Sequence, residues 1–216
     1  MRLPQRLVDI TPGDFDKKVW LGLHGSDAND CLAKLLPVAT GRRGLIGAYH
    51  GQTAGAAALS GHGARTLAGS AGHVTEIPYP DPYRPVFGGH HDPADAVLGY
   101  LRDYIFKTIS PPEDTAAIFV EALQSDAGDI VPAPHFLQGL ERLCREHEIM
   151  LVIDEVKTGF GRTATPLPVP RPSPTWTRWS DSRCPSRLSD GAAFCSRASE
   201  VSRIGIRSSE TCTGWA

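Results

Sequence analysis

The stretch LVIDEVKTGFGRT, residues 151–163, contains three apolar residues that end abruptly in two carboxylates, followed by a polar turn with two glycines. A short apolar run that follows an amphipathic helix is typical of a buried parallel strand. In an open α/β sheet, the groups just beyond the carboxyl end of a strand line the ligand crevice. The pattern therefore predicts that Asp154 meets a ligand.

The composition fits one α/β core, because the chain has 216 residues of which 41% are hydrophobic. A net charge of −2 gives no reason to expect nucleic acid or a membrane surface as partner. Five cysteines without CxxC spacing suit a reducing compartment and argue against a disulfide frame or a structural zinc site. No apolar run approaches membrane-spanning length and no signal-peptide pattern is present, so the expected location is the cytoplasm.

The first strand–turn–helix unit is predicted near residue 20. Val19–Leu23 has the apolar pattern of a buried strand, Gly25 and Ser26 follow it, and a helical run begins near Cys31. The first N–H groups of a helix lack internal partners, so this arrangement can bind a phosphate. The alternative is that Ser26 or Asp27 caps the helix, which is the commoner role of such residues.

A second short strand is predicted at 44–48, and it leads into Tyr49 and His50. An aromatic residue at a strand end can present a flat face to a planar ligand, or it can simply pack beneath a loop. The small residues 54–60 predict a closely packed helix. The proline-rich segment 77–85 predicts a long surface connection.

Scattered histidines lie in this loop-rich region without the spacing of a metal site, so we expect them on the surface or in a polar core. They are His62, His73, His90 and His91.

The second half alternates helices and strands. Apolar residues recur at helical spacing over 92–109, before Pro111-Pro112, and again over 136–147. Buried strands are predicted at 116–120, with Glu121 at the carboxyl end, and at 149–153. This order predicts a three-layer αβα fold with a mostly parallel sheet. Because parallel strands end at one edge, four side chains should converge there: Ser26, Tyr49, Glu121 and Asp154.

The character of the chain changes after Thr163. Residues 164–174 are thick with proline, and 164–216 is rich in Ser, Arg, Trp and Cys without helical or strand periodicity. We predict a partial cofactor-binding domain over 1–163 and an unrelated tail over 164–216. The tail is either disordered or translated in a shifted frame, and we favour the shifted frame because tryptophans and cysteines are unusual in a solvated tail.

Taken together, these motifs resemble those of the class III aminotransferases, which are pyridoxal-phosphate enzymes of fold type I. The resemblance rests on GSDAN at 25–29, YHG at 49–51, FVEALQ at 119–124 and DEVKTGFGRT at 154–163. It is closest to members that act on 4-aminobutyrate and other ω-amino acids, and it extends to racemases of the same family. It implies a large domain truncated at both ends, an intact parent that is a homodimer, and an amino donor and a 2-oxo acid as substrates.

The resemblance also implies roles for individual residues. Gly25 and Ser26 would hold the cofactor phosphate, and Asp154 would be the catalytic partner of the ring nitrogen. The remaining cofactor-binding residues would be Tyr49, His50, Val156 and Lys157. Glu121 would contribute to substrate selection.

Three departures from the family pattern bear on activity. Lys157 stands where members usually have Gln, and Ala122 stands where they usually have Pro. No lysine occurs after Lys157, although the family's Schiff-base lysine follows the aspartate by a few tens of residues. Without that nucleophile and base, we expect the chain as given to be inactive.

The sequence is also compatible with two other classes of function. The LVIDE run at 151–155 also resembles the magnesium-binding strand of a P-loop NTPase, but that class requires a Gly-Lys pair, which this sequence lacks. The other is a catalytically inactive partner subunit, because the family's sites form between two subunits.

Overall fold

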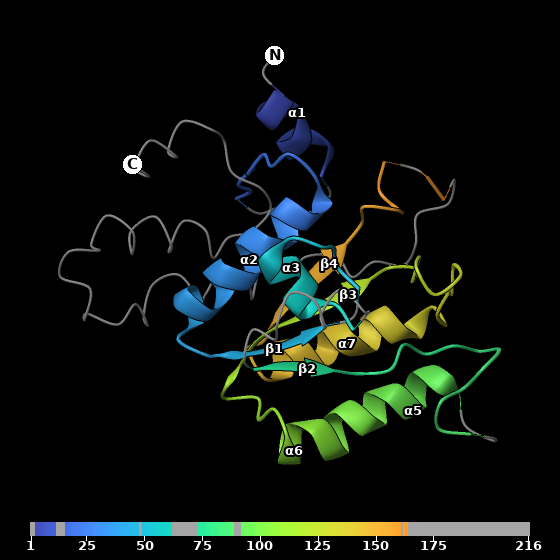
Figure 1. Cartoon of the computed structure of the whole chain (residues 1–216). Helices are drawn as coiled ribbons and strands as arrows, with labels where there is room; N and C mark the ends of the chain where they lie inside the picture. The colour runs from blue at the N-terminus through green and yellow to red at the C-terminus, as the bar shows by residue number, and fades with distance from the viewer. Residues whose placement is uncertain are drawn as a thin grey trace. The chain divides into compact units, whose positions relative to one another are not determined.

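Four parallel strands form the sheet, in the spatial order β2-β1-β3-β4 (Figure 1). They are β1 (Gly44–Gly47), β2 (Val74–Glu76), β3 (Thr115–Glu121) and β4 (Met150–Asp154). The computed structural model describes residues 3–11, 16–47, 49–61, 73–88, 92–160 and 162–163. The predicted strands at 44–48, 116–120 and 149–153 are confirmed, whereas β2 lacks a strong apolar run and was not predicted.

Strand β3 is the centre of the core. All of its residues are buried, because β1 and β4 flank it and helices cover both faces. Glu121 at its carboxyl end is in register with Asp154 of β4. The register therefore brings two carboxylates side by side at one edge of the sheet.

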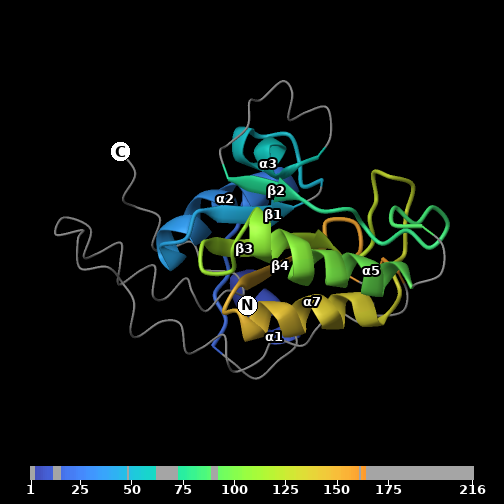
Figure 2. The same ribbon diagram turned by 90° about the horizontal axis from the view of Figure 1, so that it is seen from below.

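Helices lie on both faces of this sheet, as Figures 1 and 2 show. On one face lie α2 (Gly25–Thr40) and α3 (Ala54–Leu59), and on the other lie α5 (Pro93–Tyr100) and α7 (His135–Glu146). The buried face of α7 is apolar, with Phe136, Leu140 and Leu143 at helical spacing. The predicted three-layer αβα architecture is confirmed.

The predicted helix over 92–109 forms with an irregular centre. It consists of α5, a π-helical turn η1 (Leu101–Ile105) and α6 (Phe106–Thr108). Asp92 is its N-cap and accepts a hydrogen bond from the amide of Ala94, with Pro93 in the first turn. The helix ends shortly before Pro111, as its sequence predicts.

Arg42 joins the amino ends of the strands. Its side chain is only 13% exposed, and the two N–H groups of its Nη1 are shared among four backbone carbonyls. The acceptors are those of Pro112, His147 and Glu148, each at 3.1 Å, and of Thr115 at 3.3 Å. One guanidinium therefore satisfies carbonyls that precede β3 and β4 as well as one inside β3.

The predicted strand at Val19–Leu23 is wrong. The backbone there is irregular, and Leu23 is 92% exposed although Val19 is buried. An apolar run becomes a strand only beside a hydrogen-bonding neighbour, and none of the sheet strands in the described part of the chain pairs with it.

Residues 16–24 and the unpredicted helix α1 (Leu3–Ile10) belong to a compact unit distinct from the one that contains the sheet. Within this first unit, Nζ of Lys17 donates to the carbonyl of Thr11 at 2.7 Å.

The connection over 77–85 is irregular, as predicted, but it does not lie wholly on the surface. Tyr79 and Pro80 are buried, and the hydroxyl of Tyr79 donates to the backbone carbonyl of Glu121 at 3.0 Å. The ring of Tyr79 also packs edge-on against Phe136 of α7. Proline excluded regular structure here, but an aromatic residue still anchors the segment to the core.

None of the described helices has both the length and the apolar character needed to cross a membrane. The predicted tail over 164–216 lies outside the described residues.

Candidate active site

Asp154 lies at the carboxyl end of β4 and is held by three groups, of which two come from distant parts of the chain. Nδ2 of Asn29 donates to its Oδ2 at 2.8 Å, and Nδ1 of His50 lies 3.0 Å from the same oxygen. The backbone amide of Val156 donates to Oδ1 at 3.0 Å. The carboxylate side chain is only 9% exposed. Asp154 is thus a buried acid with donors on both of its oxygens.

These donors decide the ionisation of Asp154. Burial alone would raise the pKa of the carboxyl, but the hydrogen bonds from His50, Val156 and Asn29, together with the charge of His50, lower the pKa below its ordinary value. The aspartate is therefore an anion at neutral pH, in a place where water is largely excluded.

His50 is completely buried between the sheet and α2. Its backbone amide donates to Oγ of Ser60 at 2.9 Å, and its carbonyl accepts from Nδ2 of Asn29 at 3.0 Å. Its ring packs against Phe119 of β3, with the centroids 5.7 Å apart. These contacts fix the imidazole so that Nδ1 faces Asp154. The other ring nitrogen, Nε2, is buried and has no partner among the described residues.

Glu121 is the second acid at this edge and is 7% exposed. Its Oε1 accepts from the backbone amide of Ser125 at 3.1 Å, while its buried Oε2 has no partner in the described part of the chain. Burial raises the pKa of Glu121 above its ordinary value, and the nearby Asp154 adds to the increase, although Ser125 and His50 act in the opposite direction. The pKa values of the two neighbouring carboxyl groups are thus shifted in opposite directions, upward for Glu121 and downward for Asp154.

The amino end of α2 is packed tightly against two loops at the same edge. The helix already begins at Gly25, so Ser26 and Asp27 lie inside its first turn and neither is the residue before the helix. A Cβ at Gly25 would overlap Cγ2 of Val156, and a Cβ at Gly51 would overlap Oγ of Ser26. Gly51 must be glycine, because a Cβ there would also lie 2.9 Å from the Ser26 backbone and its φ is +120°, whereas the atoms met at Gly25 belong to the exposed Val156 side chain.

The remaining predicted residues lie at the rim. Tyr49 is half-buried, and its hydroxyl lies 3.5 Å from Nε2 of Gln52. Lys157 pairs with Asp129, with Nζ 2.6 Å from Oδ1, and both side chains are about half exposed to solvent. Val156 is 74% exposed apart from its contact with Gly25.

The structure therefore brings Ser26 and Gly25 of α2 together with the loops that contain Gly51 and Val156. His50 and Asp154 lie in direct contact, and Glu121 is beside Asp154 in the sheet register. The predicted convergence of Ser26, Glu121 and Asp154 at one edge is thus reproduced, with Tyr49 adjacent to His50 in the chain.

Two residues that hold the candidate site by hydrogen bonds were not singled out in the sequence. Asn29 donates to both Asp154 and His50, and Ser60 both accepts from the amide of His50 and donates to the carbonyl of Gly51 at 3.1 Å. The available signal for Asn29 was its spacing of four residues from Gly25, which places a polar side chain on the face of α2 that meets the sheet.

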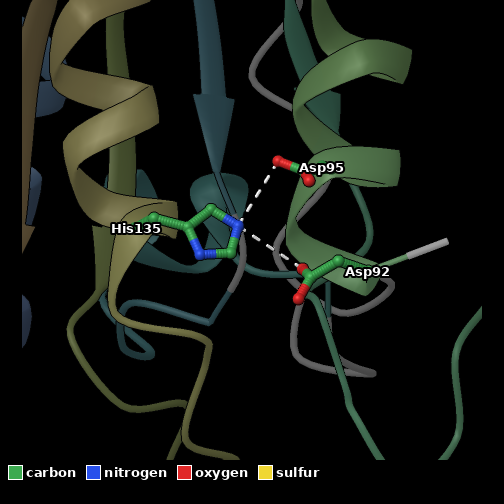
Figure 3. A group of neighbouring side chains, drawn as sticks. All are labelled: Asp92, Asp95 and His135. Carbon is green, nitrogen blue, oxygen red and sulfur yellow. Dashed lines mark ion pairs between the residues drawn. The ribbon is translucent and has the colours of Figure 1, made fainter.

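A separate polar cluster joins the amino ends of α5 and α7 (Figure 3). Nε2 of His135 lies 3.5 Å from Oδ1 of Asp92 and 3.3 Å from Oδ1 of Asp95. The three potential ligand atoms lie within 4.8 Å of one another, but all three side chains are substantially exposed. Asp92 is already engaged as the N-cap of α5, so the cluster is explained as an ion-paired contact between two helix ends.

Of the four histidines that were expected on the surface or in a polar core, His73 is exposed, and His62, His90 and His91 lie outside the described residues.

The fold and the site together define a three-layer α/β domain with a buried, ionised aspartate at the carboxyl edge of a parallel sheet. The chain belongs to the aminotransferase class-III family, since the model of that family matches residues 1–166. This assignment removes the support for the P-loop NTPase interpretation.

Individual relatives agree with the family assignment. The chain is 41% identical over 174 residues to an alanine/serine racemase of Pyrococcus horikoshii, and 43% identical over 160 residues to the 4-aminobutyrate aminotransferase of Escherichia coli. These matches cover 76% and 71% of this chain, but 36% of each relative.

A solved structure, the taurine:2-oxoglutarate aminotransferase of Bifidobacterium kashiwanohense in complex with PLP (pyridoxal 5′-phosphate) and glutamate, superposes with a TM-score of 0.69 at 28% identity. The match covers 84% of this chain and 40% of that one. The chain thus spans about two fifths or less of the length of these proteins.

Proposed function

We propose that this chain is the cofactor-binding part of a pyridoxal-phosphate-dependent transaminase that moves an amino group from an amine or ω-amino acid to a 2-oxo acid. The observation that supports this most directly is Asp154, a buried carboxylate held as an anion by three donors at the ligand edge of the sheet. An anion in that position pairs with a protonated ring nitrogen, which makes the bound pyridine ring an electron sink for substrate deprotonation.

The donor set around Asp154 fits pyridoxal phosphate. The amino end of α2, with Gly25 and Ser26, would present to a phosphate the N–H groups of a first helical turn, which have no partner within the helix itself. Tyr49 and Val156 would contact the two faces of the ring, and Lys157 would reach its oxygen substituent after leaving Asp129. His50 would act by holding Asp154 in place.

The racemase alternative is favoured by one observation, the 41% identity to an alanine/serine racemase. Both reactions begin with removal of a proton from the substrate next to its amino group, so residues up to 163 serve either one. An assay of the intact parent protein with a chiral amino acid separates them. A racemase inverts the amino acid without a 2-oxo acid, whereas a transaminase consumes the 2-oxo acid in equal amount.

The chain as given is proposed to bind the cofactor weakly and to lack turnover. No lysine follows Lys157, and Lys157 itself is three residues after Asp154 on the same turn and paired with Asp129. A covalent link to the cofactor needs a lysine that approaches from another direction.

We further propose that residues 164–216 derive from a shifted reading frame. This agrees with a family match that ends at residue 166. Sequencing the gene beyond the Thr163 codon tests the shifted frame. If neither of the other two frames encodes a family-like continuation, the proposal is contradicted.

The proposed assembly of the intact parent is a homodimer. An inactive subunit of a mixed dimer is the alternative, and co-purification with a longer aminotransferase supports that alternative while self-association alone supports the homodimer.

Cofactor titration tests the central proposal. Pyridoxal phosphate is added to the full chain and to Asp154→Asn, and binding is followed by absorbance, with borohydride treatment and mass measurement afterwards. We expect saturable binding that weakens at least tenfold in Asp154→Asn, without a specific borohydride-fixed adduct and without transamination. Equal binding by both proteins would contradict the role of Asp154, and a single fixed lysine together with turnover would contradict the proposed inactivity.

A further inference from the structure

Asn29 of α2 is the only asparagine in the sequence, and its side chain bridges two other segments of the candidate site. Its Nδ2 donates to Oδ2 of Asp154 at 2.8 Å and to the backbone carbonyl of His50 at 3.0 Å. Asn29 is 5% exposed, and the two residues it contacts are buried or nearly so. One buried amide therefore uses both of its N–H groups to connect a helix with the end of β4 and with the loop after β1.

The neighbours of this amide fix its orientation. A backbone carbonyl and an ionised carboxylate can only accept hydrogen bonds, so the nitrogen of Asn29 must face both of them. The same reasoning applies to His50, because its Nδ1 lies 3.0 Å from Oδ2 of Asp154 and must donate to that anion. Two donors therefore meet on one oxygen of Asp154.

The other oxygen of Asp154 is less fully used. A carboxylate has about four acceptor positions, two on each oxygen. Asn29 and His50 fill those of Oδ2, and the backbone amide of Val156 fills one on Oδ1 at 3.0 Å. Within the described part of the chain, the acceptor position that is left thus lies on Oδ1, the oxygen that Asn29 does not contact.

The lack of charge on Asn29 matters as much as its hydrogen bonds. A lysine or arginine in its place would form a charged pair with Asp154 and would compete with a cationic ligand. Burial alone would raise the pKa of Asp154, and the hydrogen bonds from His50, Val156 and Asn29 lower that pKa. Asn29 therefore helps to keep Asp154 ionised without neutralising it.

We propose that Asn29 is a positioning residue for Asp154. Its amide holds Oδ2 together with His50, so that the open acceptor position of the carboxylate lies on Oδ1 and is left for the protonated ring nitrogen of the cofactor. The hydrogen bonds of Asn29 exist in the chain by themselves, whereas the use of Oδ1 rests on the proposed function.

Nuclear magnetic resonance on the full chain without added cofactor tests the hydrogen bonds. Isotopic labelling of asparagine side-chain nitrogen gives signals from Asn29 alone, because the sequence has no other asparagine. We expect both N–H signals to be displaced from their positions in the urea-unfolded chain. In Asp154→Ala, one signal should return toward its unfolded position, while the N–H that faces the carbonyl of His50 stays displaced. Undisplaced signals, or signals that ignore Asp154→Ala, would overturn the proposal.

Cofactor titration tests the positioning role. Asn29→Leu keeps the size of the side chain and removes both donors, so we expect it to bind pyridoxal phosphate at least about fivefold more weakly than the parent chain. Asn29→Ala guards against misfolding of the leucine variant and should also weaken binding. Leu36→Val is the matched control, because Leu36 is buried about two turns further along α2 and its replacement alters packing alone. The control should bind as the parent does.

The outcomes separate this inference from the proposed function. Weaker binding of equal size in Leu36→Val would show that Asn29 acts only through the stability of α2, and it would overturn the positioning role. Saturable binding that is unchanged in both Asn29 variants would also overturn that role, but would leave the proposed function intact. A parent chain with the expected Asn29 signals that binds no pyridoxal phosphate supports the hold on Asp154 and contradicts the proposed function.

Discussion

The amino and carboxyl ends of the strands form two edges of the sheet, and these edges differ in how completely their buried polar groups are paired. At the amino edge, one guanidinium of Arg42 satisfies four carbonyls, and the hydroxyls of Ser110 and Thr115 lie 2.9 Å apart in a buried contact. At the carboxyl edge, His50 and Glu121 retain buried atoms without partners among the described residues. The amino edge stabilises the fold, whereas the carboxyl edge keeps hydrogen-bonding capacity for a ligand.

The difference follows from chain direction. In a parallel sheet all strands begin at one edge and end at the other, so one set of loops can be used for closure and the other for a site. Substitutions at each edge should therefore have different consequences for stability.

Replacing Arg42 should cause the largest loss of stability. Arg42→Met keeps most of the aliphatic packing but leaves four carbonyls without their donor, so we expect the free energy of unfolding to fall by about 2–4 kcal/mol. Urea unfolding followed by circular dichroism measures it. The neighbouring Arg43→Met is the control, because that side chain is exposed and only its backbone amide contacts Asp114. A loss that is equal in the two variants would refute the assignment.

Replacing Asp154 should cost less stability and should do so in a pH-dependent way. Asp154→Asn is expected to lower the free energy of unfolding by about 1–2 kcal/mol at pH 7, because charged hydrogen bonds to His50 and Asn29 are weakened. The lowered pKa of Asp154 means that its contribution is present above the ordinary aspartate pKa of about 3.9 and is lost as pH falls through the folded value. The difference from the parent chain should therefore shrink in acid, and a difference that grows in acid would count against this account.

Replacing Glu121 should change stability in the opposite direction. The raised pKa of Glu121 means that the folded state holds its proton more tightly, so the contribution is favourable in acid and is lost as pH rises from the ordinary glutamate range through the folded value. Glu121→Gln removes this loss and can still accept from Ser125, so we expect a gain of about 0.5–1 kcal/mol at pH 7. Unfolding at pH 5 and pH 7 measures it, with the exposed Glu113→Gln as reference. A clear destabilisation at pH 7 would show that the ionised form is the native one.

Replacing Lys157 should have the smallest effect. Its pair with Asp129 is about half exposed, so Lys157→Gln is expected to change the free energy of unfolding by less than about 0.5 kcal/mol. A double-mutant cycle with Asp129→Asn measures the coupling directly. A coupling well above that limit would mean that the loop containing Asp129 is part of the rigid carboxyl edge.

Most of the sheet could be predicted from the sequence, because strands buried on both faces are continuous apolar runs. Thr115–Glu121 and Met150–Asp154 are of this kind. Val74–Glu76 was not found because it is short and mostly half-buried at one end of the sheet. The run at Val19–Leu23 was misleading for the opposite reason, since its residues are apolar but no neighbour in the described chain pairs with them.

The sequence predicts where the candidate site lies, but it does not predict the hydrogen bonds that hold Asp154. Parallel topology alone places Asp154 and Glu121 at one edge. The contacts that hold Asp154 span 104 residues to His50 and 125 residues to Asn29, and no local pattern encodes contacts of that kind. Arg42 was overlooked on the same grounds, since its acceptors are backbone carbonyls, which leave no trace in the sequence.

Strand β4 has a sheet neighbour on one side only within the described part of the chain. Its other side presents backbone N–H and C=O groups, and Val152 and Ile153 are only half-buried. An open strand edge of this kind is a template for pairing with a second molecule, and open edges promote aggregation as concentration rises. The strand that presents Asp154 is thus also one of the two edge strands of the described sheet, with β2 as the other, so pairing of a second molecule along β4 would bring the backbone of that molecule next to the site.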